Sequence, residues 1–280
     1  LRAGIAVISV DAACHGARRF EDGYIAELFQ LETVEQAVSC LSQTVADELT
    51  LVDLLKGDLS DLDLLPYSPG QDAGDGVLDL DTEHIYYVGQ SMGTVIGLTF
   101  VALCEDVPAA VLNVPGAGII NIVTNGEITY PMVGSQFIPR GTTSLDTHLL
   151  CTVAQMYVDY VDPIHFAPLL HGAPSEGNGE GRHVLLQGSF NDGLIPNWCT
   201  DMLTRAIGIP VMEPYPYGVS SLPMPAYGSG LYQYSFSRNP LAAHGVLILV
   251  PECRSQLVEY LQTHYLEGKP VIRDPFAADS

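Results

Sequence analysis

The run Gly-Gln-Ser-Met-Gly at residues 89–93 places a serine between two glycines, each two positions away. Residues 84–88 have the pattern of a buried strand, and the residues that follow Ser91, to about residue 104, have the pattern of a helix. A serine on so tight a strand-to-helix turn is held in a strained backbone conformation, which lifts its hydroxyl clear of the sheet. We therefore take Ser91 as the candidate nucleophile.

The residues beside Ser91 support this interpretation. Gly89 and Gly93 leave room where the backbone passes close to itself, and Gln90 completes the elbow. The Met92 N–H group and the N-terminus of the new helix point to the place where an oxyanion would form. The alternative is a glycine-rich turn in which the serine only caps the helix.

A serine hydroxyl is a weak nucleophile, so it needs a base, and the base needs an orienting acid. After an elbow of this kind the order along the chain is serine, then aspartate or glutamate, then histidine. Asp192 lies just past a strand predicted at 183–188, where the acid is expected, although Asn-Asp-Gly is also an ordinary turn signal. Asp201 is the weaker candidate because it falls inside the next helix.

His244 is the candidate base among eight histidines. It follows a strand predicted at 231–236 and precedes the last helix, so it comes after the acid in chain order. The other seven histidines fit less well. His84 and His183 open strands at the wrong end of the sheet, and His264 lies in the last helix. His15 comes too early in the chain, and three histidines of the segment 115–180 precede the acid: His148, His165 and His171.

The elements that must position these groups alternate along the chain. Strands are predicted at 3–10, 84–88, 109–114, 183–188 and 231–236, and helices at 33–56, 92–104, 197–208 and 253–266; residues 210–230 should be irregular. The apolar run at 3–10 is typical of a strand buried on both faces. The alternation predicts an α/β fold with a mostly parallel sheet, helices on both faces, and reacting groups at the carboxyl ends of the strands.

Residues 115–180 interrupt this alternation and predict an insertion. The segment is too long for an ordinary connection and contains a helix from about 146 to 160. We expect a core formed by residues 1–114 and 181–280, with 115–180 as a cap or lid. Met156 and Tyr157 belong to an apolar cluster that would line a substrate site in such a cap. Ordinary packing of an extra helix explains the cluster equally well.

Composition limits the function classes. The chain has 280 residues, with 33 acidic and 11 basic side chains and a net charge of -22. Such a surface repels nucleic acids and anionic lipids, and it fits a secreted protein or one from a salty environment. We expect the protein to be extracellular, at the cell surface or in the periplasm. The six cysteines form no CxxC pair, and their 15 possible pairings stay open. No transmembrane segment is predicted.

No metal site or cofactor is predicted. The acidic stretch with Asp72, Asp75, Asp79, Asp81 and Glu83 lacks the spacing of an EF-hand calcium loop. Turn and cap roles explain these carboxylates adequately, and calcium remains the alternative. Serine acyl transfer itself needs no cofactor.

The motifs GQSMG, GSFNDGLIP and AAHG, in this order and with VDAACHGAR ahead, resemble the α/β-hydrolase superfamily. The run LDLDTEHIYYVGQSMGTVIGL followed by AAVLNVPGAG resembles secreted or surface-exposed bacterial lipases and esterases in particular. The resemblance implies a carboxylic ester hydrolase that works through an acyl-enzyme, with Ser91 as nucleophile, Asp192 as acid and His244 as base. A serine peptidase or amidase, and a non-catalytic scaffold or binding subunit that retains the elbow, are the alternatives.

One departure from that family carries an expectation of its own. The family has further strands ahead of the one matched by residues 3–10, and the loop after one of them donates the second oxyanion-hole N–H. No HGGG-like stretch precedes Leu1, and the strand pattern begins almost at once. We therefore expect a companion polypeptide, most simply the N-terminal part of the same precursor, that carries these strands and the second donor.

Overall fold

A six-stranded parallel sheet forms the centre of the molecule. The computed structural model describes residues 4–18, 34–63, 65, 74–171, 181–215 and 220–277. In spatial order the strands are β1 (Tyr86–Gln90), β2 (Ala109–Asn113), β3 (His183–Ser189), β7 (Gly230–Tyr234), β4 (Val211–Met212) and β5 (Ser221–Leu222), and every pairing between them is parallel. β6 (Ala226–Tyr227) and β8 (Val271–Ile272) form a separate antiparallel pair. The predicted fold class is confirmed.

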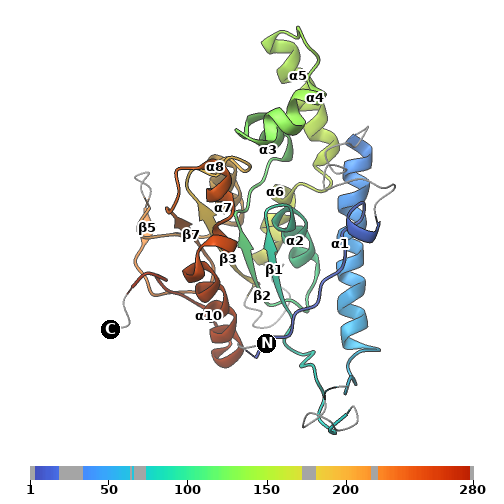
Figure 1. The fold of residues 1–280 in the computed structure, drawn as a ribbon, viewed down its shortest axis with the longest axis vertical. Helices are drawn as coiled ribbons and strands as arrows, with labels where there is room; N and C mark the ends of the chain where they lie inside the picture. Colours follow the sequence, from blue (N-terminus) through green and yellow to red (C-terminus); the bar gives the residue numbers. More distant parts are fainter. Residues whose placement is uncertain are drawn as a thin grey trace.

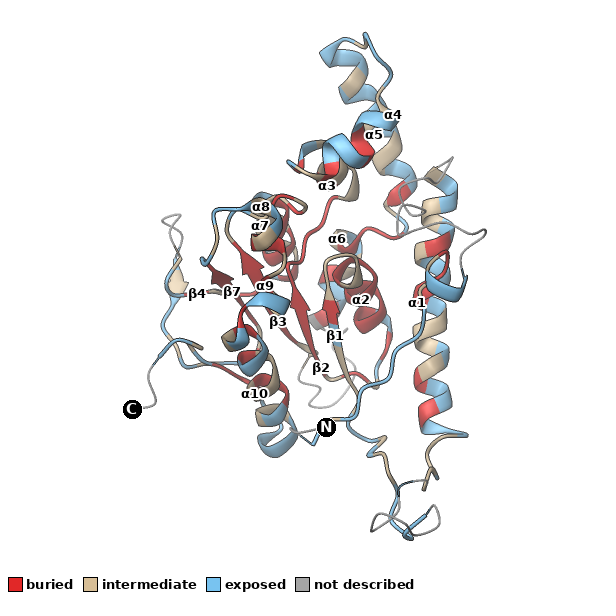
Figure 2. Ribbon diagram, in the orientation of Figure 1, coloured by how far each residue is buried: buried red, intermediate tan, exposed pale blue. Residues whose placement is uncertain are grey.

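Helices cover both faces of this sheet (Figure 1). On one face, α2 (Met92–Leu103) and α7 (Asn197–Ile207) pack on Ala110 and Leu112 of β2, and α1 (Val34–Lys56) lies outside α2. On the other face, α9 (Val246–Leu249) and α10 (Pro251–Glu267) pack with Ala109 and Val111. Neighbouring residues of β2 thus contact opposite layers, which explains why the strand is apolar throughout. Figure 2 shows the sheet as the most deeply buried layer.

The predicted strand at 3–10 is wrong. In residues 4–10 the chain forms no strand, and its apolar side chains face solvent, with Val7 87% exposed. This segment is anchored at its far end, where Cys14 forms a disulfide with Cys40 of α1 and the Ala13 N–H donates to Thr44 Oγ1 at 3.0 Å. A strand pattern specifies pairing potential, but a strand forms only where a partner edge lies alongside.

The other predicted elements form with small shifts of their ends. The helices expected at 33–56, 92–104, 197–208 and 253–266 are α1, α2, α7 and α10. β1 begins two residues later than predicted, and the region 210–230 contains three two-residue strands as well as irregular chain. All five residues of β7 are buried, because helices pack on both faces of the sheet.

The insertion after β2 consists of short helices and one longer one. These are α3 (Ile119–Asn125), the π-helix η3 (Tyr130–Gly134), α4 (Ser135–Phe137), α5 (Ser144–Val158), α6 (Pro163–Phe166) and the 3₁₀ helix η4 (Ala167–His171). α4 and α5 project away from the sheet (Figure 1). The last part packs into the main core through the buried Ala167 and Leu170.

Asp162 anchors the base of this insertion. Its buried carboxylate accepts hydrogen bonds from the Gly118 N–H at 3.0 Å, the Ile119 N–H at 2.6 Å and the Gln155 side chain at 3.0 Å. A buried carboxylate is costly unless donors surround it. Asp162 therefore joins the start of α3 to the end of α5.

The remaining sequence predictions concern cysteines, the acidic stretch and the membrane. Cys14–Cys40 is a disulfide, and the other four cysteines are free thiols: Cys104, Cys151, Cys199 and Cys253. Asp72 lies outside the described residues, whereas Asp75 and Asp81 accept backbone N–H groups in turns. Among the helices that the structure describes, none combines the length and apolarity needed to cross a membrane.

Candidate active site

Ser91 sits at the turn between β1 and α2 in a strained conformation, with φ 55° and ψ -118°. Neighbouring hydrogen bonds impose this conformation. The Ser91 N–H donates to the Asn113 carbonyl of β2 at 3.0 Å, and the Ser91 carbonyl accepts from the Thr94 N–H at 2.8 Å. Strain of this kind at a non-glycine residue persists only where the surroundings hold it, and it is concentrated at functional sites.

Gly89 is required by the tightness of the turn, whereas Gly93 is not required for the same reason. A Cβ atom on Gly89 would lie 2.2 Å from the Gly93 carbonyl oxygen. A Cβ atom on Gly93 would have the Tyr87 hydroxyl, at 3.8 Å, as its nearest neighbour. The turn thus brings the Gly93 carbonyl, and not the Gly93 Cα, against Gly89. The crowding that the motif predicts at both glycines therefore exists only at Gly89.

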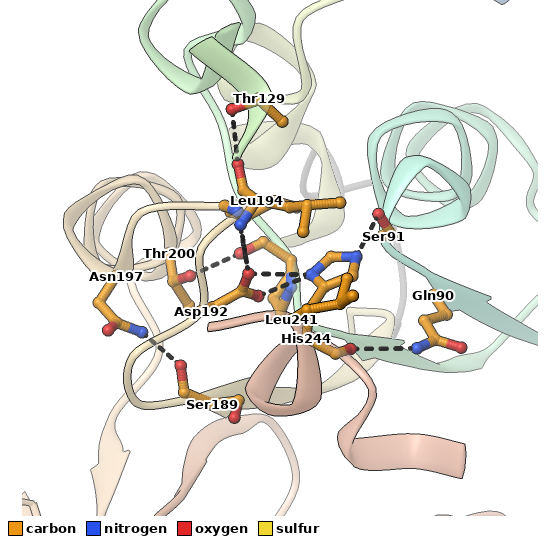
Figure 3. Close-up of polar contacts among 12 residues, drawn as sticks. Gln90, Ser91, Thr129, Ser189, Asp192, Leu194, Asn197, Thr200, Leu241 and His244 are labelled. Carbon is orange, nitrogen blue, oxygen red and sulfur yellow. Dashed lines mark hydrogen bonds and ion pairs between the residues drawn. The ribbon is translucent and has the colours of Figure 1, made fainter. Parts of the chain in front are cut away.

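The three sequence-predicted side chains meet at the carboxyl edge of the sheet (Figure 3). His244 Nε2 lies 2.8 Å from Ser91 Oγ, and His244 Nδ1 lies 2.9 Å from Asp192 Oδ2 and 3.0 Å from Oδ1. One ring nitrogen therefore faces the hydroxyl and the other faces the carboxylate. A neutral imidazole held by an acid at Nδ1 presents its Nε2 lone pair to the serine proton, which is the arrangement that general-base activation requires.

Asp192 is fixed on the loop that follows β3. Its Oδ1 accepts from the backbone N–H groups of Leu194 at 2.9 Å and Ile195 at 3.1 Å, and its side chain is 3% exposed. These donors stabilise the ionised carboxylate and set its direction toward the imidazole. Asn-Asp-Gly is thus both a turn and the acid-bearing loop.

His244 ends the short helix α8 (Pro240–His244). The side chain of Asn239 caps this helix by accepting from the Leu241 N–H at 3.1 Å and the Ala242 N–H at 2.9 Å. Gln90 donates to the His244 carbonyl at 3.3 Å, so a residue of the elbow also holds the histidine backbone. This contact gives Gln90 a role that its place in the motif did not indicate.

The insertion braces the acid loop directly. The Ile128 N–H donates to the Gly193 carbonyl at 2.7 Å. The Thr129 hydroxyl shares its proton between the Ile122 carbonyl at 2.7 Å and the Leu194 carbonyl at 3.1 Å. Figure 3 shows Thr129 above the loop that carries Asp192. Sequence reasoning missed Thr129, because nothing in a local pattern indicates a partner 65 residues away.

The rejected candidates lie elsewhere. Asp201 is inside α7, where it accepts from the Tyr215 hydroxyl at 2.5 Å. His84 pairs with Asp81 ahead of β1, at the opposite end of that strand from Ser91. Neither Asp201 nor His84 is among the groups that contact Ser91, Asp192 or His244 in the described part of the chain.

The structure shows where Met92, Met156 and Tyr157 lie, but it does not test the roles that the sequence predicts for them. Met92 is the first residue of α2, where helix N–H groups have no intrahelical partner, so its proposed oxyanion role remains a prediction. Met156 and Tyr157 lie on α5 and are 65% and 50% exposed. Their suggested contact with substrate also remains a prediction.

Asp192→Asn tests the site as an assembled unit. An asparagine keeps the shape but not the charge, and it no longer holds the imidazole in the tautomer that accepts the serine proton. We expect labelling of Ser91 by a fluorophosphonate to slow on the order of 10³–10⁴-fold, in line with the loss seen for such a change in a triad. The matched control is Asp201→Asn, which should label at the wild-type rate. Equal rates in Asp192→Asn and wild type would contradict the triad.

No protein-family model matches the chain, and no match was found among curated proteins. Solved structures resemble it weakly. An acylaminoacyl peptidase from Pyrococcus horikoshii is 13% identical, with a TM-score of 0.45, over 82% of this chain and 29% of the peptidase. An esterase from Pyrococcus furiosus is 12% identical, with a TM-score of 0.41, over 79% of this chain and 61% of the esterase. Acetyl xylan esterase 1 from a Thermoanaerobacterium is 13% identical, with a TM-score of 0.42, over 78% and 59% of the two chains.

The chain therefore spans less than a third of the peptidase and about three fifths of the two esterases. Similarity at this level says nothing about the reaction, which has to be inferred from the site. The parallel sheet, the strained turn at Ser91 and the chain order Ser91, Asp192, His244 agree with the resemblance to the α/β-hydrolase superfamily that the sequence motifs indicate.

Proposed function

We propose that the chain is a serine hydrolase that cleaves carboxylic esters through an acyl-enzyme. The observation that carries the proposal is the contact of 2.8 Å between His244 Nε2 and Ser91 Oγ, with Asp192 behind the imidazole. In the first step His244 takes the Ser91 proton while Ser91 Oγ attacks the ester carbonyl. His244 then returns the proton to the leaving alcohol, and a water molecule activated by the same imidazole releases the acid.

The oxyanion of each tetrahedral intermediate needs donors placed in advance. Met92 N–H supplies the first in this proposal, because Met92 directly follows Ser91 and is the first residue of α2. We propose that a companion polypeptide supplies the second. Removing one such donor costs about 10²–10³ in turnover in a measured case, so the second donor has a large effect on rate.

Ser91→Ala tests the reaction and its substrate class. We expect turnover of a short p-nitrophenyl ester to fall about 10⁵–10⁶-fold, because the hydroxyl and its base act as a unit. Ser135→Ala, which changes an exposed serine of the insertion, should leave turnover unchanged. The substrates are a panel of esters and peptide amides of matched acyl group. If the wild type prefers the amides, the proposed function becomes that of a peptidase. If it neither turns over a substrate nor is labelled, a non-catalytic scaffold is favoured.

The cap proposal concerns the exposed apolar side chains of α5. We propose that Met156 and Tyr157 contact the acyl chain of the ester. Each methylene buried against them contributes about 0.8 kcal/mol, so losing contact with two of them should cost roughly tenfold. Met156→Ala and Tyr157→Ala should therefore lower kcat/KM for an eight-carbon ester relative to a two-carbon ester by about that factor. Leu266→Ala, which removes an exposed leucine of α10, is the control. An unchanged chain-length profile would exclude the contact.

The companion polypeptide is proposed from the edge of the sheet. Among the described residues, β1 pairs only with β2, so the strand that carries the nucleophile has a second edge without a strand partner. Val88 of β1 and the apolar residues at 7–10 are exposed. Parallel strands are ordinarily covered on both faces and paired on both edges. An extended strand beside β1 would cover these side chains and bring a loop, with its N–H donor, to the carboxyl edge.

Native mass spectrometry tests this partner. Material purified from its source should contain the chain in a tight complex with a second fragment rich in strand pattern, and separating the two should reduce turnover. A monodisperse, fully active 30.1 kDa monomer would exclude the companion.

We further propose that the protein acts outside the cytoplasm, because the Cys14–Cys40 disulfide and the net charge of -22 suit an oxidising, aqueous compartment.

A further inference from the structure

A tyrosine and a glutamate lie behind the nucleophile turn and play no part in the triad. The Tyr87 hydroxyl of β1 donates to the Gly93 carbonyl at 2.7 Å, two residues beyond Ser91. On the other side of that hydroxyl, Glu48 Oε1 of α1 lies at 3.5 Å. Glu48 Oε2 is buried and has no hydrogen-bond partner within the described part of the chain. A buried carboxyl oxygen without a partner is costly, so its presence beside the turn calls for a physical explanation.

Glycines shape the space around the tyrosine ring. A Cβ atom on Gly97 of α2 would lie 2.0 Å from Tyr87 Cε1, and one on Gly89 would lie 2.8 Å from the same atom. The ring therefore fits only because two residues that face it lack side chains. Its position is tightly determined, and its hydroxyl is held against the Gly93 carbonyl in the first turn of α2.

The Tyr87 hydroxyl has one proton to donate. While Glu48 is neutral, its own O–H can donate to the tyrosine oxygen, and the tyrosine proton stays on the Gly93 carbonyl. Once Glu48 is ionised, the carboxylate attracts the tyrosine proton and competes with that carbonyl. The two charge states of Glu48 thus hold the Gly93 carbonyl with different strength.

Glu48 changes charge near neutral pH. Burial raises the pKa of Glu48 to about 7, against the opposing effect of the Tyr87 hydrogen bond, and the negative charge of Asp47 raises it further. Burial also raises the pKa of Tyr87 well above its usual range, so the tyrosine keeps its proton. Of the helices that contact α1, α2 carries no ionisable side chain. The ionisable side chains of α5 do not shift the pKa of Glu48; these are Asp146, His148, Cys151 and Tyr157.

We propose that Glu48 is a positioning residue that acts through Tyr87 on the turn carrying Ser91. Its neutral form keeps the Gly93 carbonyl bonded to Tyr87 and the turn rigid, and its ionised form loosens that bond. The effect on rate rests on the proposed role of Ser91 as nucleophile. The effect on the turn itself does not.

The first test is the rate at which a fluorophosphonate labels Ser91 between pH 5 and pH 9. In the wild type the rate should fall above about pH 7 as Glu48 ionises. Glu48→Gln stays neutral and should lose the falling limb. At pH 9 it should label about tenfold faster than the wild type, the effect of one hydrogen bond of ordinary strength. Tyr87→Phe should label slowly at every pH, also without a falling limb.

The control is Glu35→Gln, the same change at an exposed position in the first turn of α1, which should keep the wild-type profile. The second test needs no activity. Hydrogen exchange of residues 91–97, corrected for its intrinsic pH dependence, should lose protection as pH rises through about 7 in the wild type but not in Glu48→Gln. Tyr87→Phe should lack that change as well, which keeps the test valid if Glu48→Gln folds poorly.

A third measurement follows from linkage. The pKa of Glu48 is higher in the folded chain than its ordinary value of 4.5, so the folded state binds the proton more tightly. The resulting stabilisation is complete below pH 4.5 and is lost as pH rises through about 7. The melting temperature of the wild type should therefore fall relative to Glu48→Gln across that window.

The outcomes separate the two proposals. If the wild type is labelled but Glu48→Gln keeps the fall in labelling rate above about pH 7, the role of Glu48 is overturned and Ser91 stays the nucleophile. Absence of labelling at any pH would overturn the proposed function, and the exchange data would then decide the role of Glu48 alone. Exchange of residues 91–97 with the same pH dependence in wild type and Glu48→Gln would overturn it in either case.

Discussion

The close approach of the Gly93 carbonyl to Gly89 is the contact on which the rest of the site depends. It exists because β1 turns into α2 within one residue, and that residue, Ser91, takes a positive φ that a side-chain-bearing residue ordinarily avoids. The strain is sustained by backbone bonds to Asn113 and Thr94, which belong to the neighbouring strand and the new helix. The same turn places the serine hydroxyl at the carboxyl edge of the sheet, 2.8 Å from His244 Nε2.

The parallel sheet turns this local feature into a site. Because β1 and β3 run in the same direction, the elbow and the loop bearing Asp192 end at one edge, and β7 leads to His244 at that edge too. Each loop is then fixed by its own contacts: Asp192 by two backbone N–H groups, His244 by the Asn239 cap and by Gln90. The insertion adds a brace through Ile128 and Thr129, so it supports the acid whatever its role toward substrate.

The side of the molecule beyond β1 is organised differently. There α1 packs on α2 and its Glu48 lies next to Tyr87, while residues 4–10 run exposed toward the disulfide at Cys14. β1 thus pairs with β2 on one side, and among the described residues α1, not a strand, lies toward its other side (Figure 1). Interactions on this second side act on the serine turn from behind, through the backbone of α2 and not through the triad.

The sequence by itself determined the type and order of most elements and indicated three side chains, Ser91, Asp192 and His244, that the structure brings into contact. The Gly-Gln-Ser-Met-Gly run between a strand pattern and a helix pattern indicates a tight turn at Ser91, and chain order selects Asp192 and His244 from their competitors. Only the tertiary structure decided the rest. The apolar run at 3–10 has strand-forming residues, yet residues 4–10 pair with no strand and are largely exposed. Thr129, Gln90 and the Glu48–Tyr87 pair owe their roles to contacts between residues that lie 39 to 154 positions apart in the chain. No periodicity or motif encodes which distant atom a side chain will meet.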